Sequence, residues 1–400
     1  MSSSRFVALL CVAEVASMAG FATFPALLPQ FLAEWNLSNT EAGWINGIFS
    51  AGYMAAVIVL AAFTDRMPAR NVYVASCLLS AVAAFGFALL ASGFWSALAF
   101  RALAGIGLAG TYVPGLKALS DHVQGPFQSR AVAFYTSTFS VGASLSLVAA
   151  GEIAHAAGWQ AAFLVAGFGP LAAAGLAAAL LSGERPRAAH GHQLLDFRPV
   201  LRNRPAMGYV VGYACHMWEL FGVRNWLVAF LAYCAVLAPS DSALWRPATV
   251  AAVVSLAGLV AGIAGNELAM RHGRARFLTR AMLVAAASSC LFGLVGGLPL
   301  PVVAAIAFVY CFLNSWDSAA LTAGVVAHAE PQLRGTTMAL QSGLGFLAAA
   351  ASPLVFGLVL DLAGGNRSGV AWACAFASLA AGVALGPLAL RWAGLRARDG

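Results

Sequence analysis

Long apolar runs alternate with short polar patches along the whole chain, and this pattern predicts membrane-spanning helices. A helix that crosses a membrane needs about 20 consecutive, mostly apolar residues. Twelve runs satisfy this requirement, so we predict an all-α membrane protein with twelve transmembrane helices. The predicted spans are residues 6–30, 42–62, 72–92, 97–119, 131–151, 160–182, 206–235, 247–268, 278–297, 301–326, 337–360 and 370–391.

The longest polar stretch lies between the sixth and seventh runs and divides the chain into two parts. It predicts an N-terminal six-helix bundle over residues 1–182, a cytoplasmic linker over residues 183–205 and a C-terminal six-helix bundle over residues 206–400. Basic loops recur at equivalent places, since Arg130 precedes the fifth run and Arg334 precedes the eleventh. This repetition of basic loops indicates two pseudo-symmetric bundles that arose from a duplicated unit, as in many transporters.

The composition and the charge distribution are those of an integral membrane protein. Hydrophobic residues make up 61% of the chain and charged residues 9%, whereas soluble domains carry about 25% charged residues. The net charge is +7, and the basic residues concentrate in the loops that would face the cytoplasm. This asymmetry predicts a multi-pass protein of the cytoplasmic (inner) membrane with both termini in the cytoplasm. The positive charge therefore reports topology, and we expect no nucleic-acid partner.

Three short motifs stand in loops and helices where a family of transporters carries similar ones. They are Asp65-Arg66-x-x-x-Arg70, Arg101-x-x-x-Gly105-x-Gly107 and Arg334-Gly335. Together with the twelve-helix layout, these motifs make the chain resemble the major facilitator superfamily over nearly its whole length. The first motif departs from the family pattern at Pro68, where glycine is usual.

The resemblance implies an architecture and a mechanism. It implies two six-helix bundles around a central cavity, which is lined by the first, fourth, seventh and tenth spans. This cavity opens alternately to the two sides of the membrane. The resemblance also implies that Asp65, Arg66 and Arg70 form a gating loop, a charge latch on the inner side. We expect this latch to tune conformational exchange and not the choice of substrate.

Ionisable residues within the predicted spans are candidates for function, because a charge at bilayer depth is costly and usually faces a cavity or a partner. The deepest are Glu14, Arg101, Glu219, Arg224 and Asp317. The resemblance places these residues on the spans that line the cavity.

The seventh predicted span, residues 206–235, concentrates candidates for substrate binding. His216 and Glu219 are three residues apart and share a helix face, whereas Arg224 lies roughly 140° around the helix from Glu219. Arg224 would hold an anionic substrate through bidentate contacts, while Glu219 or His216 takes a proton. Alternatively, Glu219 and Arg224 pair with other helices and stabilise the bundle. The substrate-binding candidates are Arg224, His216, Glu219, Trp218, Tyr112, Trp316 and Asn314.

Four of the ionisable residues are candidates for proton coupling: Glu14, Glu219, Asp317 and Arg101. A buried Glu14 without a fixed cation can load and release a proton, or it can stay neutral and hydrogen-bond to a neighbouring helix. Arg101 can instead extend its guanidinium toward the outer surface. Asp317 belongs to a polar break over residues 314–317, and it is either a second proton site or the partner of Arg224.

The alternative function is proton-driven export of hydrophobic or cationic compounds, that is, drug efflux. Its cavity would use aromatic side chains, and alignment of the halves on Arg130 and Arg334 places Trp316 opposite Tyr112 as walls of one cavity. The same two residues can be ordinary packing aromatics. Drug antiporters of the superfamily usually carry a Gly-Pro pair in the glycine-rich stretch over residues 142–151, and its absence here argues against this alternative.

These features predict a secondary active transporter that moves a small polar or anionic metabolite by alternating access and is coupled to protons. The chain has no phosphate-binding glycine loop with a lysine, so we expect that ATP does not drive transport. We expect no enzymatic activity, no cofactor and no metal. The expected partners are a small-molecule substrate, protons and the lipid bilayer, and one chain contains a full transport path, so we expect a functional monomer.

Overall fold

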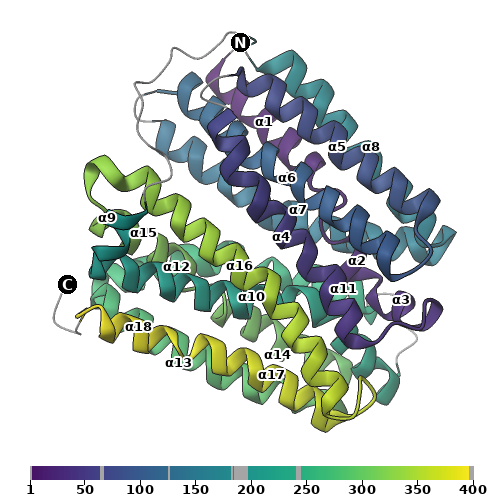
Figure 1. Ribbon diagram of the computed structural model, residues 1–400. Helices are drawn as coiled ribbons and strands as arrows, with labels where there is room; N and C mark the ends of the chain where they lie inside the picture. The colour runs from purple at the N-terminus through teal and green to yellow at the C-terminus, as the bar shows by residue number, and fades with distance from the viewer. Residues whose placement is uncertain are drawn as a thin grey trace. The chain divides into compact units, whose positions relative to one another are not determined.

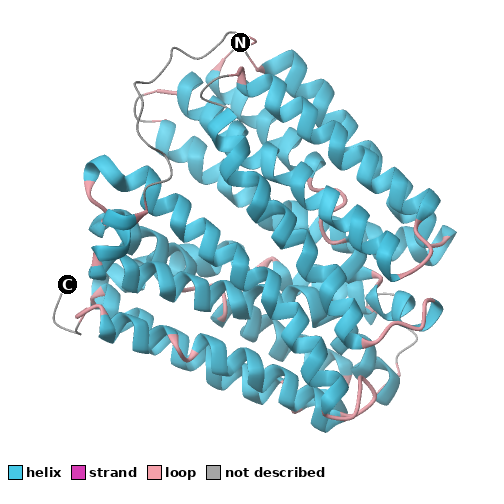
Figure 2. Cartoon of the chain, in the orientation of Figure 1, coloured by secondary structure: helices cyan, strands magenta, loops and turns pink. Residues whose placement is uncertain are grey.

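The computed structural model describes residues 2–63, 67–124, 127–181, 183, 197–239 and 245–395. All regular secondary structure in these ranges is helical (Figure 2). Ten helical stretches among them are long and apolar enough to cross a membrane, and they coincide with the third to twelfth predicted spans. The prediction of an all-α membrane protein is confirmed, while the count of twelve spans stays a prediction.

The structure divides into two compact units, which are described separately. The first contains Met1–Leu27 and Ile48–His192, and the second contains Leu28–Gly47 and Gln193–Gly400. The helices of the first unit, labelled in Figure 1, are α1 (Ser3–Ser17), α2 (Thr23–Ala26), most of α4 (Asn39–Phe63), α5 (Ala69–Leu90), α6 (Phe94–His122), α7 (Gln128–Ala157) and α8 (Trp159–Leu180).

The second unit contains α3, the start of α4 and the helices of the C-terminal half. The α-helices are α3 (Leu28–Glu34), α9 (Arg198–Arg202), α10 (Arg204–Leu237), α11 (Pro247–Ser255), α12 (Ala257–His272), α13 (Arg274–Phe292), α14 (Leu300–Leu313), α15 (Ser318–His328), α16 (Arg334–Leu362), α17 (Gly369–Val383) and α18 (Gly386–Trp392). Two short 3₁₀ helices, Val295–Gly297 and Pro331–Leu333, lie between them. Most of the predicted linker, residues 184–196, lies outside the described residues.

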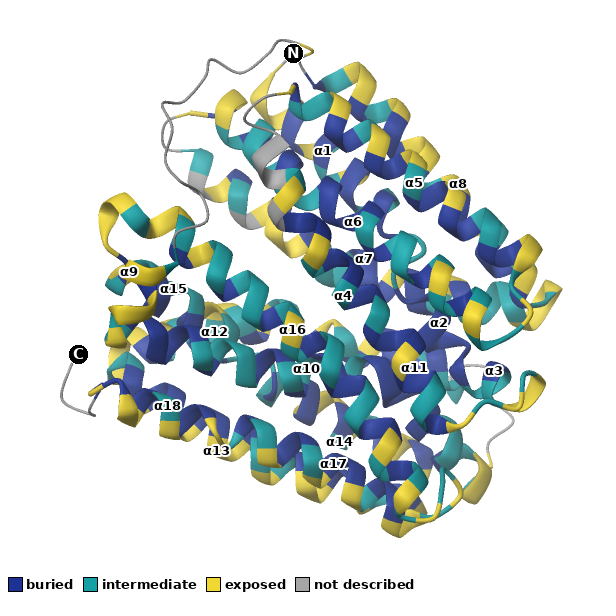
Figure 3. Cartoon of the chain, viewed as in Figure 1, coloured by how far each residue is buried: buried dark blue, intermediate teal, exposed yellow. Residues whose placement is uncertain are grey.

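Each unit has its own apolar core (Figure 3). In the first unit, Leu10 of α1, Tyr73 of α5 and Ala177 of α8 are completely buried in one cluster. In the second unit, Val210 of α10 and Leu278 of α13 are completely buried in another. The polar residues described below are buried within these two units, where water is scarce and hydrogen-bond partners must come from the protein.

The first predicted span is interrupted. α1 ends at Ser17, a turn follows, and α2 begins at Thr23. Ser146 of α7 donates its hydroxyl hydrogen to the carbonyl oxygen of Ala19 at 2.7 Å and accepts the N–H of Ala22 at 3.0 Å. Backbone polar groups at membrane depth must find partners within the protein. The serine side chain therefore replaces bonds that the interrupted helix lacks.

The tenth predicted span is interrupted as well, at the polar residues that predicted a break. α14 ends at Leu313 and α15 begins at Ser318, so residues 314–317 form the turn between them. The carbonyl oxygen of Trp316 approaches α12 so closely that a Cβ on Gly265 would lie 1.6 Å from it. Only glycine fits at this position, and the turn therefore packs tightly against α12.

A carboxylate holds the N-terminus of α4 inside the second unit. Asp361, near the end of α16, accepts the backbone N–H groups of Asn39 at 3.1 Å and Thr40 at 2.8 Å. It also accepts hydrogen bonds from the side chains of the same two residues. A negative charge at a helix N-terminus is favourable because the unpaired N–H groups point toward it. This contact explains why the start of α4 groups with the C-terminal half.

Candidate functional site

Two buried polar clusters, one in each unit, contain most of the ionisable residues that the sequence singled out. In the first unit, Glu14 and Arg101 are 0% and 3% exposed. In the second unit, His216, Glu219 and Asp317 are each 1% exposed. Burial at this level means that the surrounding side chains decide which protonation states and ligands each group can accept.

Glu14 sits near the end of α1, one turn before the interruption of that helix. Its Oε2 accepts hydrogen bonds from the hydroxyl of Tyr73 on α5 at 3.1 Å and the hydroxyl of Tyr135 on α7 at 2.9 Å. Its Oε1 is buried and has no hydrogen-bond partner among the described residues. The Tyr135 hydroxyl also lies 3.2 Å from the carbonyl oxygen of Tyr112. The carboxyl group is thus held by two neutral hydroxyls from two other helices.

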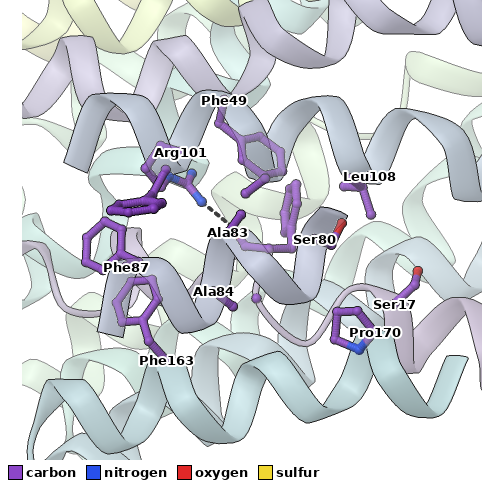
Figure 4. A pocket seen from close by; sticks show the side chains of 14 residues that line it. Ser17, Phe49, Ser80, Ala83, Ala84, Phe87, Arg101, Leu108, Phe163 and Pro170 are labelled. Carbon is purple, nitrogen blue, oxygen red and sulfur yellow. Dashed lines mark hydrogen bonds between the residues drawn. The ribbon is translucent and has the colours of Figure 1, made fainter. Parts of the chain in front are cut away.

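Arg101 lies on α6, and its guanidinium is enclosed by aromatic rings instead of reaching the surface (Figure 4). The carbon atom Cζ is 4.3 Å from the centre of the Phe49 ring and 5.8 Å from that of Phe24. Nη1 donates a long hydrogen bond of 3.4 Å to the carbonyl oxygen of Phe21, and Nε has no partner within the described ranges. The extension toward the outer surface that we considered for Arg101 is therefore not what the structure shows.

The motif glycine that follows Arg101 by one turn explains why the ring of Phe49 is so close. A Cβ on Gly105 would lie 2.0 Å from the carbonyl oxygen of Phe49, so α4 and α6 approach at their backbones. Small residues allow such close contacts between membrane helices. Glycine at this motif position thus brings α4 against the arginine.

In the second unit, the turn between α14 and α15 carries a carboxylate to a histidine of α10. Nδ1 of His216 lies 2.8 Å from Oδ1 of Asp317. The contact is poorly aligned for a hydrogen bond, and Nε2 of the same ring has no partner in the described part of the chain. Asp317 therefore contacts His216, the first of the polar residues predicted on the seventh span.

Glu219 lies one turn further along α10 and begins a chain of hydroxyl groups. The hydroxyl of Tyr310 on α14 lies 3.0 Å from Oε1 of Glu219 and 2.9 Å from Oγ of Ser289 on α13. Ser289 in turn donates to the carbonyl oxygen of Phe376 on α17 at 2.9 Å. Four helices therefore meet in one hydrogen-bonded network around a single carboxyl group.

The hydrogens of this network can be counted. Ser289 must donate to Phe376, because a carbonyl oxygen carries no hydrogen. Tyr310 then has one hydroxyl hydrogen for two oxygen neighbours, Glu219 and Ser289. Both contacts receive a hydrogen only when Glu219 is itself protonated and donates to Tyr310. The geometry therefore favours a protonated Glu219.

Arg224 and Trp218 face different surroundings on α10. Arg224 is half-buried, and its Cζ lies 5.5 Å from the centre of the Phe221 ring. Nε1 of Trp218 donates to the carbonyl oxygen of Ser378 on α17 at 3.2 Å. The indole of Trp218 therefore serves helix packing in this structure.

The remaining predicted residues lie close to the two clusters. Tyr112 packs beside Tyr135 with ring centres 5.5 Å apart, next to Glu14. In the turn of the tenth span, Trp316 packs against Phe277 at 5.4 Å. Its buried Nε1 has no partner among the residues described, and the side chain of the buried Asn314 accepts from Ser315 at 2.9 Å.

The predicted gating loop is described only in part. Asp65 and Arg66 lie outside the described residues, while Arg70 lies in the first turn of α5 and is half-buried. The charge latch that the resemblance implies for these three residues therefore stays a prediction.

Sequence reasoning missed the hydroxyl groups that surround the two glutamates. Tyr73, Tyr135, Tyr310 and Ser289 are all completely or nearly completely buried. Hydroxyl groups within apolar runs were the available signal, since a buried tyrosine hydroxyl usually finds a hydrogen-bond partner. Their pairing with Glu14 and Glu219 depends on the rotation of each helix, which the sequence did not define.

Comparisons with known proteins agree on one family. The family model described as Major Facilitator Superfamily matches residues 10–353. A relative in Salmonella enteritidis PT4, an "Uncharacterized MFS-type transporter YcaD", is 28% identical over 41% of this chain and 43% of its own length. A "Putative metabolite transport protein" of Haemophilus influenzae is 24% identical over 62% of this chain and 63% of its own. The matches therefore span less than two thirds of either relative.

A solved structure shows the same fold along the whole chain. It is a bacterial homologue of the human lysosomal transporter Spinster, in an inward-facing and unoccupied conformation. The alignment has a TM-score of 0.79 and 15% sequence identity, and it covers 99% of this chain and 97% of the other. At this identity the likeness concerns the fold alone.

Proposed function

Because the chain belongs to the major facilitator superfamily of transporters, we propose that it moves a small polar or anionic metabolite across the cytoplasmic membrane by proton-coupled alternating access. In this proposal two six-helix bundles, residues 1–182 and 206–400, rock about a central cavity, with both termini in the cytoplasm. One chain supplies the full path and works as a monomer.

The observation that carries the proton coupling is the setting of Glu14. It is completely buried, it accepts hydrogen bonds from two tyrosine hydroxyls, and no lysine or arginine of the described chain lies within 4.0 Å of it. Oε2 of Glu14 has hydrogen-bond partners in both protonation states, whereas Oε1 has none among the described residues. The carboxylate accepts from Tyr73 and Tyr135, while the acid can donate to Tyr135, which then donates to the carbonyl of Tyr112. A residue that cycles between two protonation states needs partners for both.

The substrate class rests on α10. Arg224 supplies a guanidinium that could form charge-assisted hydrogen bonds with a carboxylate or a similar anion. His216, Glu219, Asn314 and Trp316 add donors and acceptors from the same unit. The Haemophilus influenzae relative, a putative metabolite transport protein, is consistent with a metabolite as substrate.

The drug-export alternative would use a cavity of aromatic side chains, and two tryptophans of α10 instead pack and hydrogen-bond between helices. Trp226 is completely buried, stacks on Phe356 and donates to the carbonyl oxygen of Pro353 at 3.0 Å. Trp218 donates to Ser378. Aromatic side chains that are committed to packing cannot line a site for a bulky hydrophobic compound, so we favour the metabolite.

The test begins with a thermal-shift screen of the purified protein against small carboxylates, inorganic anions, nucleoside-like metabolites and cationic drugs. A ligand that binds the folded state raises its melting temperature. We expect a small organic anion to stabilise the wild type but not Arg224→Ala. The control is Arg271→Ala, which removes an exposed arginine bonded to Glu267 and should keep the response. Stabilisation by lipophilic cations alone, retained in Arg224→Ala, would favour drug export.

The ligand found in this way is then followed in proteoliposomes. We expect accumulation against its gradient when a proton gradient is imposed, and collapse of that accumulation when a protonophore is added. Accumulation that does not depend on the proton gradient would contradict proton coupling, but it would not contradict the proposed substrate class.

A further inference from the structure

A small cavity lies inside the first unit, between the interrupted first span and helices α4, α5, α6 and α8 (Figure 4). Its walls include Ser17, Ser80, Phe49, Phe87, Phe163 and Arg101. The volume open to the centres of water molecules is about 30 Å³, which is room for about two waters. The cavity is therefore too small for an organic metabolite.

The charge of Arg101 at this cavity is not balanced by the described protein. No carboxylate of the described chain lies within 4.0 Å of its guanidinium, and it is only 3% exposed. Its polar contact is the long bond to Phe21, and Nε remains without a partner in this part of the structure. Burying a cation without a counter-charge is costly, and the rings of Phe49 and Phe24 offset this cost only in part.

We propose that this cavity binds a small inorganic anion of the size of chloride beside the guanidinium of Arg101. The anion would supply the missing negative charge and accept the unused N–H of Nε. Ser80 on the cavity wall would offer a further hydroxyl donor to it, whereas the hydroxyl of Ser17 already donates to the carbonyl oxygen of Glu14. The aromatic rings would shield the anion from water. This assigns Arg101 to a resident anion, and the inference goes beyond the proposed metabolite transport, whose proposed anion-binding residue is Arg224 in the second unit.

The experiment compares melting temperatures of the detergent-purified full chain in sodium chloride and in sodium gluconate at equal ionic strength. Gluconate is too large for the cavity. We expect the wild type to melt at least about 2 °C higher in saturating chloride, and bromide to replace chloride. Arg101→Gln should lose this difference, because its side chain is neutral. Arg271→Gln, which removes an exposed arginine outside the cavity, should retain it.

Two further measurements keep the test decisive. Ala104→Val adds two methyl groups to the cavity wall while leaving Arg101 in place, and it should also abolish the chloride response. Crystals of the wild type grown in bromide should show an anomalous peak next to Nε of Arg101, a readout that does not depend on any variant folding. Equal melting temperatures in the two salts, an unchanged response in Arg101→Gln, or bromide data with no peak at Arg101 would each overturn the proposal.

Discussion

Glu14 and Glu219 are both buried carboxyl groups next to tyrosine hydroxyls, but different numbers of hydroxyl hydrogens can reach the two carboxyl groups. Two tyrosines, Tyr73 and Tyr135, contact a single oxygen of Glu14 and can both donate to it. Glu219 has one tyrosine, Tyr310, whose only hydroxyl hydrogen is shared with Ser289. A Glu14 carboxylate can therefore receive two hydroxyl hydrogens, although Tyr135 then gives up its contact with the carbonyl oxygen of Tyr112. A Glu219 carboxylate can receive only one, and the contact between Tyr310 and Ser289 then has no hydrogen.

This difference indicates which glutamate is suited to proton coupling and which one is suited to hydrogen bonding between helices. A coupling residue must release and regain its proton in each cycle, and the surroundings of Glu14 suit either state. Glu219 also lies one turn along α10 from His216, the residue that Asp317 contacts, so an ionised Glu219 would be repelled by a nearby second carboxylate. We therefore expect Glu219 to keep its proton and to act as a hydrogen-bond donor between helices.

The largest expected effect is on transport, where glutamine variants of the two residues should differ. Glutamine resembles a protonated glutamate in shape and can donate a hydrogen bond, but it cannot release a proton. Glu14→Gln should lower uphill accumulation in proteoliposomes by at least about tenfold, which corresponds to about 1.4 kcal/mol. It should leave exchange of labelled for unlabelled substrate intact. Glu219→Gln should retain accumulation within about twofold of the wild type, because it mimics the state that the network favours.

The same two variants can also contradict the roles assigned to Glu14 and Glu219. Accumulation that survives in Glu14→Gln and disappears in Glu219→Gln would reverse the two assignments. Loss in both variants, with exchange preserved, would mean that the glutamates act as one coupled pair.

A smaller effect should appear when a tyrosine hydroxyl is removed from each network. Tyr310→Phe takes away the group that links Glu219 to Ser289, and it leaves a buried polar group without a partner, at a cost of about 1–3 kcal/mol. Tyr73→Phe leaves Tyr135 in contact with Glu14, so its cost should be about 0.5–1.5 kcal/mol. Melting temperatures of the purified variants measure the difference. Equal losses would show that the two networks are equally redundant.

Helix lengths and the interruption of the tenth span could be predicted from the sequence. Apolar length alone locates the third to twelfth spans, because a bilayer sets the number of residues that each must have. The polar residues 314–317 also predicted the break between α14 and α15. The interruption after Ser17 carried no such signal, since the residues of its turn are small or apolar. This interruption depends on hydrogen bonds to Ser146 of α7, which is distant in the sequence.

The partners of the buried residues could not be predicted for a related reason. A helix that is apolar on all sides has no pattern that defines which face meets which neighbour. Glu14, Glu219 and Asp317 stand out in the sequence because charge at bilayer depth is rare. That Asp317 contacts His216 and not Arg224 follows from where the turn after α14 places its carboxylate. Such contacts depend on tertiary packing.

The two glutamine variants should also differ in stability, by a still smaller amount. In Glu14→Gln, an amide group occupies the place of Oε1, which has no partner in the described structure, so a buried donor is left unsatisfied. We expect Glu14→Gln to be less stable than Glu219→Gln by about 1 kcal/mol, at the lower end of the range for such groups. Denaturation of both variants in the same detergent measures this difference. A more stable Glu14→Gln would indicate that the wild-type Glu14 is the more strained of the two.

The smallest change in stability should come from Ser289→Ala, and it offers the sharpest test of the hydrogen count. Without the serine oxygen, the hydroxyl hydrogen of Tyr310 has only Glu219 to bond, and the second network comes to resemble the first. The cost should be about 0.5–1 kcal/mol, the value of one ordinary hydrogen bond. The infrared band of a protonated carboxyl group should be present in the wild type at neutral pH, and it should lose the contribution of Glu219 in Glu219→Gln. It should weaken in Ser289→Ala, because the network no longer needs the proton of Glu219. If the band is the same in wild type and Ser289→Ala, the tyrosine hydrogen does not decide the protonation of Glu219, and burial beside Asp317 is sufficient by itself.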